Sequence, residues 1–411
     1  MGARAAFICL TTLTLSCASA PWRHEAVAIS LDDLLAGTPL GLPRQPPDLA
    51  DEPPVLAVSD EMREFLDAHV TRTAGRVVRL RQLTAAIVGE DTFGLHYDET
   101  TRTAPETFGA RRGNCLSFSH MFVALAREIG LQARYQEVDT PPDWTFKDDA
   151  FVLNRHVNVL VDLGREGEHL VDFNLADFRT SYERRTISDA RALAHHHNNV
   201  AVERMGAGDT AAALLHFRRA TENDPSFSPA WTNLGTLYVR EGHPRYAEAA
   251  YLQALRADAG DLVAMSNLAN LYARRGDRRR ADACRDRVAF HRERNPYYRY
   301  HLAREAFEAQ DYDGAIGHLR YAIRRKKNED RFYFLLGLSH LKKGDERQAQ
   351  RWLALAEEVA ATDALKRRYA DKLEILLSSS PDGTPSRLGR QSTGEAPERL
   401  PRDEAQDRCR S

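Results

Sequence analysis

The chain has 411 residues, 43% of them hydrophobic and 28% charged, which is enough for two or three globular units. Its 57 basic and 59 acidic residues leave a formal net charge of −2. This balance argues against a dedicated nucleic-acid-binding protein, because such a protein carries a basic excess. No apolar run approaches ~18 residues, which disfavours a transmembrane helix. Ordinary glycine and proline contents exclude fibrous and wholly disordered chains.

The first twenty residues have the layout of a secretory signal peptide: a basic start, an apolar stretch from Ala5 to Leu15, and then small residues. Two cleavage sites compete. Cleavage after Ala20 is disfavoured because a proline follows. The tripeptide that ends at Cys17 resembles a bacterial lipoprotein box, in which the cysteine is lipidated and becomes the mature N-terminus. We therefore predict a lipoprotein signal peptide over residues 1–16, with simple export as the alternative.

Two stretches lack the regularly spaced apolar residues of a folded unit. The proline-rich sequence after the signal predicts an extended tether over residues 17–58, which would hold the folded part away from a membrane. Residues 378–411 are rich in Ser, Pro, Gly and Arg and are predicted to be disordered, with no role for Cys409. The folded units are therefore expected between residues 59 and 377.

Residues 59–193 have the pattern of a compact α+β domain. Helical spacing of apolar residues begins after Ser59, which is a suitable N-cap. A strongly apolar helix is predicted from Leu116 to Ile129, and three β-like runs follow it, at 133–138, 157–163 and 169–173. A helix followed by strands within one segment is typical of an α+β fold.

Residues 194–361 repeat with a period of 34 residues. Small residues recur at this interval, as Gly235, Ala269, Ala303 and Gly337 and as Ala213, Ala247, Ala281, Ala315 and Ala349. The period and pattern resemble the tetratricopeptide repeat (TPR), in which paired helices stack into a solenoid. We predict repeats at about 194–227, 228–261, 262–295, 296–329 and 330–361, and a capping helix at 362–377.

The first helices of such repeats line a concave groove that holds a peptide or a tail. The repeat register places five candidate partner-binding side chains on these helices: Asn233, Asn267, Asn270, Tyr300 and Arg304. We therefore expect a protein or peptide partner for the array, and no nucleic acid.

Cys115 is the one cysteine that calls for a chemical explanation. It follows Gly113 and Asn114 at the first turn of the predicted apolar helix. The unpaired N–H groups and the dipole at that end favour a thiolate and would stabilise an oxyanion on an attacked carbonyl. His156 opens a strand 41 residues later, and Asp172 opens or ends the next strand, so antiparallel neighbours would bring a base beside an orienting carboxylate. The alternative is an ordinary buried cysteine.

The sequence Gly-Asn-Cys-Leu-Ser-Phe at a helix start, followed by His156 and Asp172, resembles the transglutaminase-like core, a branch of the papain-like thiol fold. The resemblance spans residues 60–190 and implies that Cys115 is the nucleophile, His156 the base and Asp172 its orienter. It also implies hydrolysis or exchange of amide bonds. The family's oxyanion-hole side chain is not located by the motif, and Asn114 and Tyr97 are the candidates.

Three consecutive histidines, His195 to His197, suggest a metal site by composition alone. Consecutive residues on a helix point ~100° apart, however, and cannot converge on one ion. We therefore expect no metal and no cofactor, and we predict that this run is a solvated linker or part of the first repeat helix.

In chain order, the sequence predicts an α+β papain/transglutaminase-like domain followed by an all-α TPR solenoid. The predicted setting is a lipoprotein of the bacterial cell envelope that faces the periplasm from either membrane. The predicted activity is that of a thiol hydrolase or acyltransferase acting on amide or peptide bonds, with the array recruiting a protein partner or substrate. The alternative is a non-catalytic envelope scaffold whose thiol domain is structural.

Overall fold

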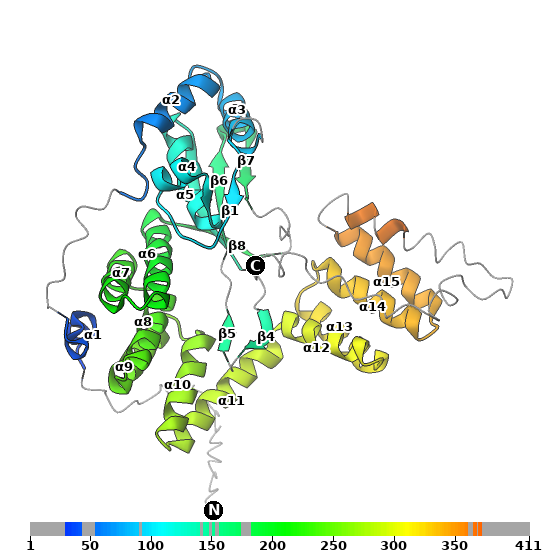
Figure 1. The fold of residues 1–411 in the computed structure, drawn as a ribbon. Coiled ribbons are helices and arrows are strands. Elements are labelled where there is room, and N and C mark those ends of the chain that lie inside the picture. The colour runs from blue at the N-terminus through cyan, green and yellow to red at the C-terminus, as the bar shows by residue number, and fades with distance from the viewer. Residues whose placement is uncertain are drawn as a thin grey trace, which may run out of the picture.

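The computed structural model describes residues 29–42, 54–89, 93–139, 143–147, 150–152, 156–173, 182–360, 365–367 and 369–371 (Figure 1). Within these residues, a unit of helices and strands precedes ten helices, α6 to α15, that pack as five hairpins. None of the described helices is both long and apolar enough to cross a membrane. The expected signal peptide, Cys17 and the expected disordered tail lie outside the described residues and stay predictions.

A four-stranded antiparallel sheet forms the centre of the first unit. In spatial order its strands are β7 (Glu168–Val171), β6 (His156–Asp162), β3 (Gln132–Val138) and β8 (Arg184–Ile187). The helix α5 (Cys115–Glu128) packs on this sheet, and its residues from Leu116 to Ala126 are all buried. The predicted helix and the three predicted strands are therefore confirmed, with ends that differ by a residue or two, and β8 is an additional strand.

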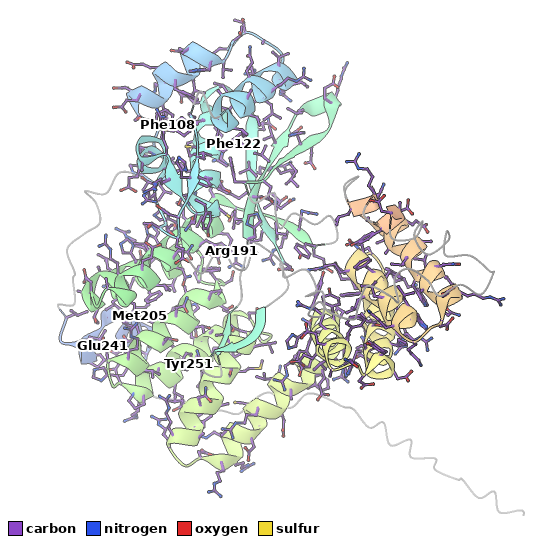
Figure 2. The ribbon with its side chains drawn as sticks, turned by 45° about the vertical axis from the view of Figure 1, so that its right-hand side comes forward. Phe108, Phe122, Arg191, Met205, Glu241 and Tyr251 are labelled. Atoms are coloured by element: carbon purple, nitrogen blue, oxygen red, sulfur yellow. The ribbon has the colours of Figure 1, made fainter. Side chains whose placement is uncertain are left out.

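Shorter elements complete the first unit. The helices α2 (Asp60–His69) and α3 (Arg76–Val88) share its core, in which Phe122 of α5 lies (Figure 2). The helix α4 (Ala104–Ala110) lies beside α5. The remaining elements are the parallel pair β1 (His96–Tyr97) and β2 (Arg112–Gly113), the hairpin β4 (Asp143–Lys147) and β5 (Ala150–Val152), and the 3-10 turn η3 (Gly164–Glu166).

The second unit is a curved array of five helix hairpins (Figure 1). They are α6 (Asp189–Gly206) with α7 (Thr210–Asn223), α8 (Ser228–Arg240) with α9 (Pro244–Ala257), α10 (Leu262–Arg274) with α11 (Arg278–Arg294), α12 (Pro296–Glu308) with α13 (Tyr312–Arg325), and α14 (Asp330–Lys342) with α15 (Glu346–Val359). The hairpins fall on the predicted repeats, except that the first begins at Asp189 instead of 194. Residues 365–367 and 369–371 are helical where the sequence predicts a capping helix.

Small residues at the register positions let the paired helices cross closely. The five alanines of the 34-residue series are fully buried. A Cβ atom added to Gly235 would lie 2.5 Å from the ring of Tyr251, so the two helices touch at this point. The turn inside a hairpin uses a glycine at positive φ, for example 78° at Gly242, but Gln310 adopts a φ of 64° in the fourth hairpin.

Charged groups join the first array helix, α6, to the sheet and to α5 of the first unit. Glu137 of β3 accepts a hydrogen bond from His195 Nε2 at 2.7 Å and pairs with Arg191 Nε at 3.2 Å. Arg127 near the end of α5 donates twice to Asp189, at 2.6 and 2.8 Å. Burial raises the pKa of Glu137, but its bond with His195 and the nearby arginines lower the pKa to about 2. The carboxylate therefore stays ionised, and Arg191 lies between the two units (Figure 2).

The array also meets the first unit at its far end. Arg331 of α14 donates from Nη2 to the hydroxyl of Tyr182 at 3.2 Å, and Tyr182 lies just before β8. The ring of Tyr182 meets the ring of Tyr297 of α12 edge-on, with centroids 6.3 Å apart. Strand β5 lies beside α10. The two units are thus in contact at several points along the array.

Part of the predicted tether is folded. Residues 29–42, which we call the N-terminal strap, form the short helix α1 (Leu31–Ala36) and the 3-10 turn η1 (Thr38–Leu40). Leu34 is buried in the core of the first two hairpins, and its carbonyl accepts a hydrogen bond from Tyr238. The prediction of an extended chain over residues 17–58 is therefore wrong for the strap, because its leucines pack on an apolar face of the array. A six-residue helix is too short to show this in the sequence.

Candidate thiol site

Cys115 is the first residue of α5 and is partly exposed, whereas the next eleven residues of the helix are buried. Asn114 is the N-cap, and its Oδ1 accepts a hydrogen bond from the N–H of Ser117 at 3.0 Å. A Cβ atom on Gly113 would lie 2.6 Å from Ser117 Cβ, so close packing against the helix start requires glycine there. The first N–H groups of a helix have no acceptor within it. The thiol therefore lies at an end of α5 that favours negative charge.

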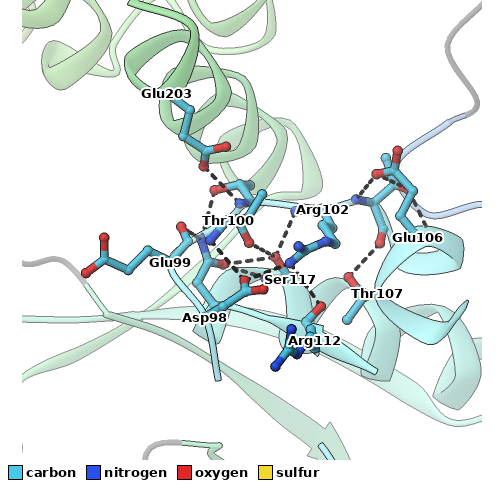
Figure 3. A network of polar contacts seen from close by, with 12 residues as sticks. Asp98, Glu99, Thr100, Arg102, Glu106, Thr107, Arg112, Ser117 and Glu203 are labelled. Carbon is cyan, nitrogen blue, oxygen red and sulfur yellow. Dashed lines mark hydrogen bonds and ion pairs between the residues drawn. The ribbon is translucent and has the colours of Figure 1, made fainter. Parts of the chain in front are cut away.

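A loop wraps around this helix start and is bonded to it at several points (Figure 3). We call residues 98–103 the collar. The N–H of Asp98 donates to the carbonyl of Gly113 at 3.1 Å, and the N–H of Arg102 donates to Ser117 Oγ at 2.9 Å. Asn114 Nδ2 donates to Thr101 Oγ1 at 2.8 Å. The collar therefore fixes the residues on both sides of Cys115.

The predicted base and its carboxylate lie on neighbouring antiparallel strands. His156 is the first residue of β6, and Asp172 follows the last residue of β7. His156 Nε2 lies 2.8 Å from Asp172 Oδ1, and Asn158 Nδ2 donates to Asp172 Oδ2 at 2.9 Å. The side chains of His156 and Asp172 are 13% and 5% exposed, so their hydrogen bond is shielded from water. Because both carboxylate oxygens are engaged, the orientation of the imidazole is fixed.

The electrostatics of His156 connect it to Cys115. Burial lowers the pKa of His156, but its hydrogen bonds with Asp172 and Cys115 outweigh burial and raise the pKa to about 10. Since Nε2 faces Asp172, Nδ1 is the ring nitrogen that is left for the thiol. The structure thus brings the three predicted residues together in the order thiol, imidazole, carboxylate. Nucleophilic attack by a cysteine needs this order, because the carboxylate supports the charge that the imidazole gains.

Two contacts hold the helix of Cys115 against the strands of the base. Ser119 is fully buried, and its Oγ lies 2.9 Å from the carbonyl oxygen of Cys115 and 3.2 Å from that of Val157. Its hydroxyl therefore bridges α5 and β6. The ring of Phe173, at the end of β7, lies 5.6 Å from the ring of Phe118 on α5. Together these contacts set the separation of the thiol from the imidazole.

The two oxyanion candidates have different surroundings. Asn114 uses Oδ1 as the helix cap and donates from Nδ2 to Thr101 Oγ1 at 2.8 Å and to the carbonyl of Glu99 at 3.4 Å. Both ends of the Asn114 amide are thus engaged, in the helix cap and in the collar, and its oxyanion role stays a prediction. Tyr97 is opposite Gly113 in the β1–β2 pair and is 52% exposed. Its oxyanion role stays a prediction.

The five candidate partner-binding residues lie on the first helices of their hairpins, as expected, but two of them are engaged inside the array. Asn233 donates to Asn198 of α6 at 2.9 Å. Tyr300 packs on the ring of Phe332, with centroids 5.3 Å apart. The other three, Asn267, Asn270 and Arg304, are half-buried. A binding role for these residues stays a prediction, and it suits the last three better than the first two.

The histidine run lies in α6, as one of the two alternatives predicted, but it is buried instead of solvated. His196 lies between His120 and His197, with ring centroids 5.3 Å from each. His197 Nδ1 is 3.1 Å from His216 Nδ1. We call these four residues the junction histidines. Among the residues described, no three His, Cys, Asp or Glu side chains are arranged to hold a metal ion.

Burial makes the junction histidines poor bases. It lowers the pKa of His120 and His197 to about 3 and that of His216 to about 4, and it lowers the pKa of His196 well below its ordinary value. Neighbouring imidazoles add to the effect for His120, His196 and His197. The contact between α5, α6 and α7 is therefore built from neutral imidazoles.

Sequence reasoning missed three residues that support the site. Asn158 holds Asp172, Ser119 bridges the helix and the strand, and Glu203 of α6 accepts a hydrogen bond from the N–H of Thr101. The sequence could have indicated the first two, because Asn158 shares a strand face with His156 and Ser119 lies one helical turn after Cys115. Nothing in the sequence pairs Glu203 with a loop about a hundred residues earlier.

Family models match two parts of the chain. The transglutaminase-like superfamily matches residues 70–168, and the tetratricopeptide repeat matches residues 228–261. The chain thus contains a transglutaminase-like domain followed by a TPR array, and the predicted fold class is confirmed. No curated protein gives a significant match.

Solved structures of several repeat proteins are similar to the array. YrrB, described as a TPR protein with an unusual peptide-binding site, is 18% identical with a TM-score of 0.23, over 44% of this chain and 92% of that one. The MamA protein is 19% identical with a TM-score of 0.23, over 43% and 95%. Pseudomonas aeruginosa pilF is 16% identical with a TM-score of 0.25, over 47% and 96%.

Proposed function

We propose that this chain is an exported thiol hydrolase or acyltransferase for amide or peptide bonds, and that its TPR array recruits a protein partner or substrate. The observation that carries the catalytic part is the position of His156. Its ring bonds to Asp172 through Nε2, and Asp172 and Cys115 together raise the pKa of the imidazole to about 10. A cysteine that serves only to pack the core needs no such partner.

The chemistry follows from these three groups. The Cys115 thiolate attacks the carbonyl carbon, a C–S bond forms, and the carbonyl electrons move to the oxygen, which faces the N–H groups at the start of α5. When the intermediate collapses, the C–N bond breaks and the imidazolium of His156 gives its proton to the leaving amine. Water then attacks the thioester carbon and His156 accepts the proton of the water. The C–S bond breaks, the acid leaves, and the thiolate and the imidazolium are restored. An amine in place of water would give transfer.

Hydrolysis is the outcome that we favour, because no residue identified at the site selects an amine acceptor. Asp172 takes no proton in this cycle. It fixes the ring of His156 and stabilises its charge, and Asn158 in turn holds the second oxygen of Asp172. Asp172 and Asn158 therefore have different roles in this proposal: Asp172 orients His156, and Asn158 orients Asp172.

Alkylation of Cys115 by iodoacetamide tests the catalytic part, with the labelled peptide identified by mass. In the wild type, the positive charge of the His156 imidazolium beside the thiol should keep the alkylation rate high at pH 6. His156→Gln should slow alkylation at pH 6 by at least about tenfold. His169→Gln is the matched control, because His169 lies on β7 and is exposed.

Equal rates for the wild type and His156→Gln would remove the basis of the enzyme proposal. We would then prefer the alternative function, a non-catalytic envelope scaffold whose thiol domain is structural. Loss of reactivity in both histidine variants would instead indicate a disturbed sheet, and Asp172→Asn would then decide. That variant keeps the shape of the site but favours a neutral His156, so it should also slow alkylation at pH 6.

Export and lipid anchoring are supported by the sequence of the first twenty residues alone. The proposal is a lipoprotein of the bacterial cell envelope, anchored through Cys17 and facing the periplasm. Palmitate labelling of the expressed chain should be abolished by Cys17→Ala and retained in Cys9→Ala, which changes a cysteine inside the apolar stretch. Labelling that persists in Cys17→Ala would refute the anchor.

A further inference from the structure

We infer that Glu203, a residue of the TPR array, is a positioning residue for the thiol site, because it holds the collar that in turn holds the helix cap before Cys115. The inference rests on the proposed thiol chemistry, since it assigns a role at that site. It makes α6, the first array helix, part of the thiol site as well as a neighbour of the transglutaminase-like domain.

Three hydrogen bonds connect the array to the thiol. Glu203 Oε1 accepts from the backbone N–H of Thr101 at 2.8 Å. Thr101 Oγ1 accepts from Asn114 Nδ2 at 2.8 Å, and Asn114 Oδ1 accepts from the N–H of Ser117 at 3.0 Å. Figure 3 shows Glu203 reaching from α6 to the loop that carries Thr100 and Arg102. Cys115 follows Asn114 directly in the chain, so this series of hydrogen bonds ends beside the nucleophile.

The contact from Glu203 is needed because Thr101 is buried, with only 7% of its surface exposed. A buried N–H without an acceptor costs about 1–3 kcal/mol, so the collar would shift to find one if the carboxylate were removed. Among the described residues, the other hydrogen bonds of the collar stay within residues 98–117 of its own unit. Among the described residues, Glu203 is therefore the one whose hydrogen bond holds the collar to the array.

The helix α6 is a rigid support for this contact. Its first turns are fixed to the sheet and to α5 through Glu137 and Arg127, as described above. Glu203 lies farther along the same helix, where α6 also packs on α7 and α8. A movement of the first hairpin relative to the sheet would reach the collar through Glu203, so a partner held by the array has a route to the reactivity of Cys115.

The test measures alkylation rates of Cys115 in the full chain from pH 6 to pH 9, with the melting temperature of each variant recorded. Glu203→Ala removes the acceptor and should slow alkylation at pH 7 about tenfold. Glu203→Gln keeps an oxygen in the same place and should stay within about twofold of the wild type. Glu241→Ala should leave the rate unchanged, because Glu241 accepts a hydrogen bond from Thr210 inside the array, away from the collar.

A second variant keeps the inference testable if Glu203→Ala folds poorly. Thr101→Val preserves shape and the backbone N–H but removes the oxygen that Asn114 donates to, so it should slow alkylation to a similar degree. Because both changes act on one series of contacts, the double variant should be no slower than the slower single variant. Multiplied effects in the double variant would overturn the inference, as would a Glu203→Gln rate as low as that of Glu203→Ala.

The two proposals fail in different ways. A wild-type rate that does not depend on His156 refutes the thiol chemistry. A rate that depends on His156 but is the same in Glu203→Ala refutes the positioning role and leaves the thiol chemistry intact.

Discussion

The junction histidines make the contact between the two units sensitive to acid. Each is neutral in the folded chain and has an ordinary pKa near 6.5 when unfolded, so unfolding takes up protons below that pH. A group whose folded pKa is lowered in this way stabilises the fold at high pH, and the stabilisation is lost as the pH falls. Between pH 6 and pH 5, each histidine should cost about 1.2 kcal/mol, or about 5 kcal/mol for the four.

His156 does not offset this loss. Its folded pKa is raised to about 10, so its stabilisation is fully present below pH 6.5, and both the folded and the unfolded states are largely protonated between pH 6 and pH 5. The loss of about 5 kcal/mol from the four junction histidines is a large part of the stability of an ordinary domain, which is about 5–15 kcal/mol. Acid should therefore weaken the junction while His156 stays protonated.

Guanidinium unfolding at pH 6.0, 5.5 and 5.0, followed by tryptophan fluorescence, measures the slope of the unfolding free energy against pH. The double variant His197→Phe with His216→Phe removes two of the titrating groups and should lower the slope by about 2.4 kcal/mol per pH unit. His243→Gln, a change away from the junction, serves as the control. Equal slopes for the wild type and the double variant would show that these imidazoles do not titrate on unfolding, and the reasoning would fail.

Two further predictions concern the packing of the array. Gly235→Ala should destabilise the chain by about 1–3 kcal/mol, because its Cβ would press on the Tyr251 ring. Gly317→Ala, with open space around it on α13, should stabilise the chain by about 0.5–1 kcal/mol. A lower melting temperature for both variants would contradict this prediction. Tyr369→Phe should cost about 1–2 kcal/mol in urea unfolding, because the hydroxyl donates to buried Asp330 at 2.6 Å, and an unchanged midpoint would show that the capping segment does not support the last hairpin.

The array was the most predictable part of the molecule. Its 34-residue period constrains every hairpin, because a small residue is needed wherever two helices touch, as at Gly235 beside Tyr251. The first helix departs from this rule. It begins at Asp189, after the N-cap Ser188, and Asp189 pairs with Arg127 of the other unit, which is a contact that the repeat pattern does not contain.

The candidate site was predictable where its residues are close in pattern and not where they are close only in space. Cys115, His156 and Asp172 were found because a helix start and two antiparallel strands bring them together by local geometry. The contact of Asn114 Nδ2 with Thr101 was missed because the path of the collar depends on the fold. The strap was missed for a similar reason, since Leu34 is buried by residues about two hundred positions later.

The strap also has a consequence for the order in which the chain assembles. Its contact with Tyr238 closes a loop that contains the whole thiol domain. During synthesis, the strap emerges long before the hairpins that it packs on, so its docking has to wait until the second hairpin has formed. Contacts this far apart in sequence form late, because the entropy of closing the loop is lost before the contact can stabilise it. The strap is therefore expected to join only after the second hairpin has formed, and to detach early under mild denaturation.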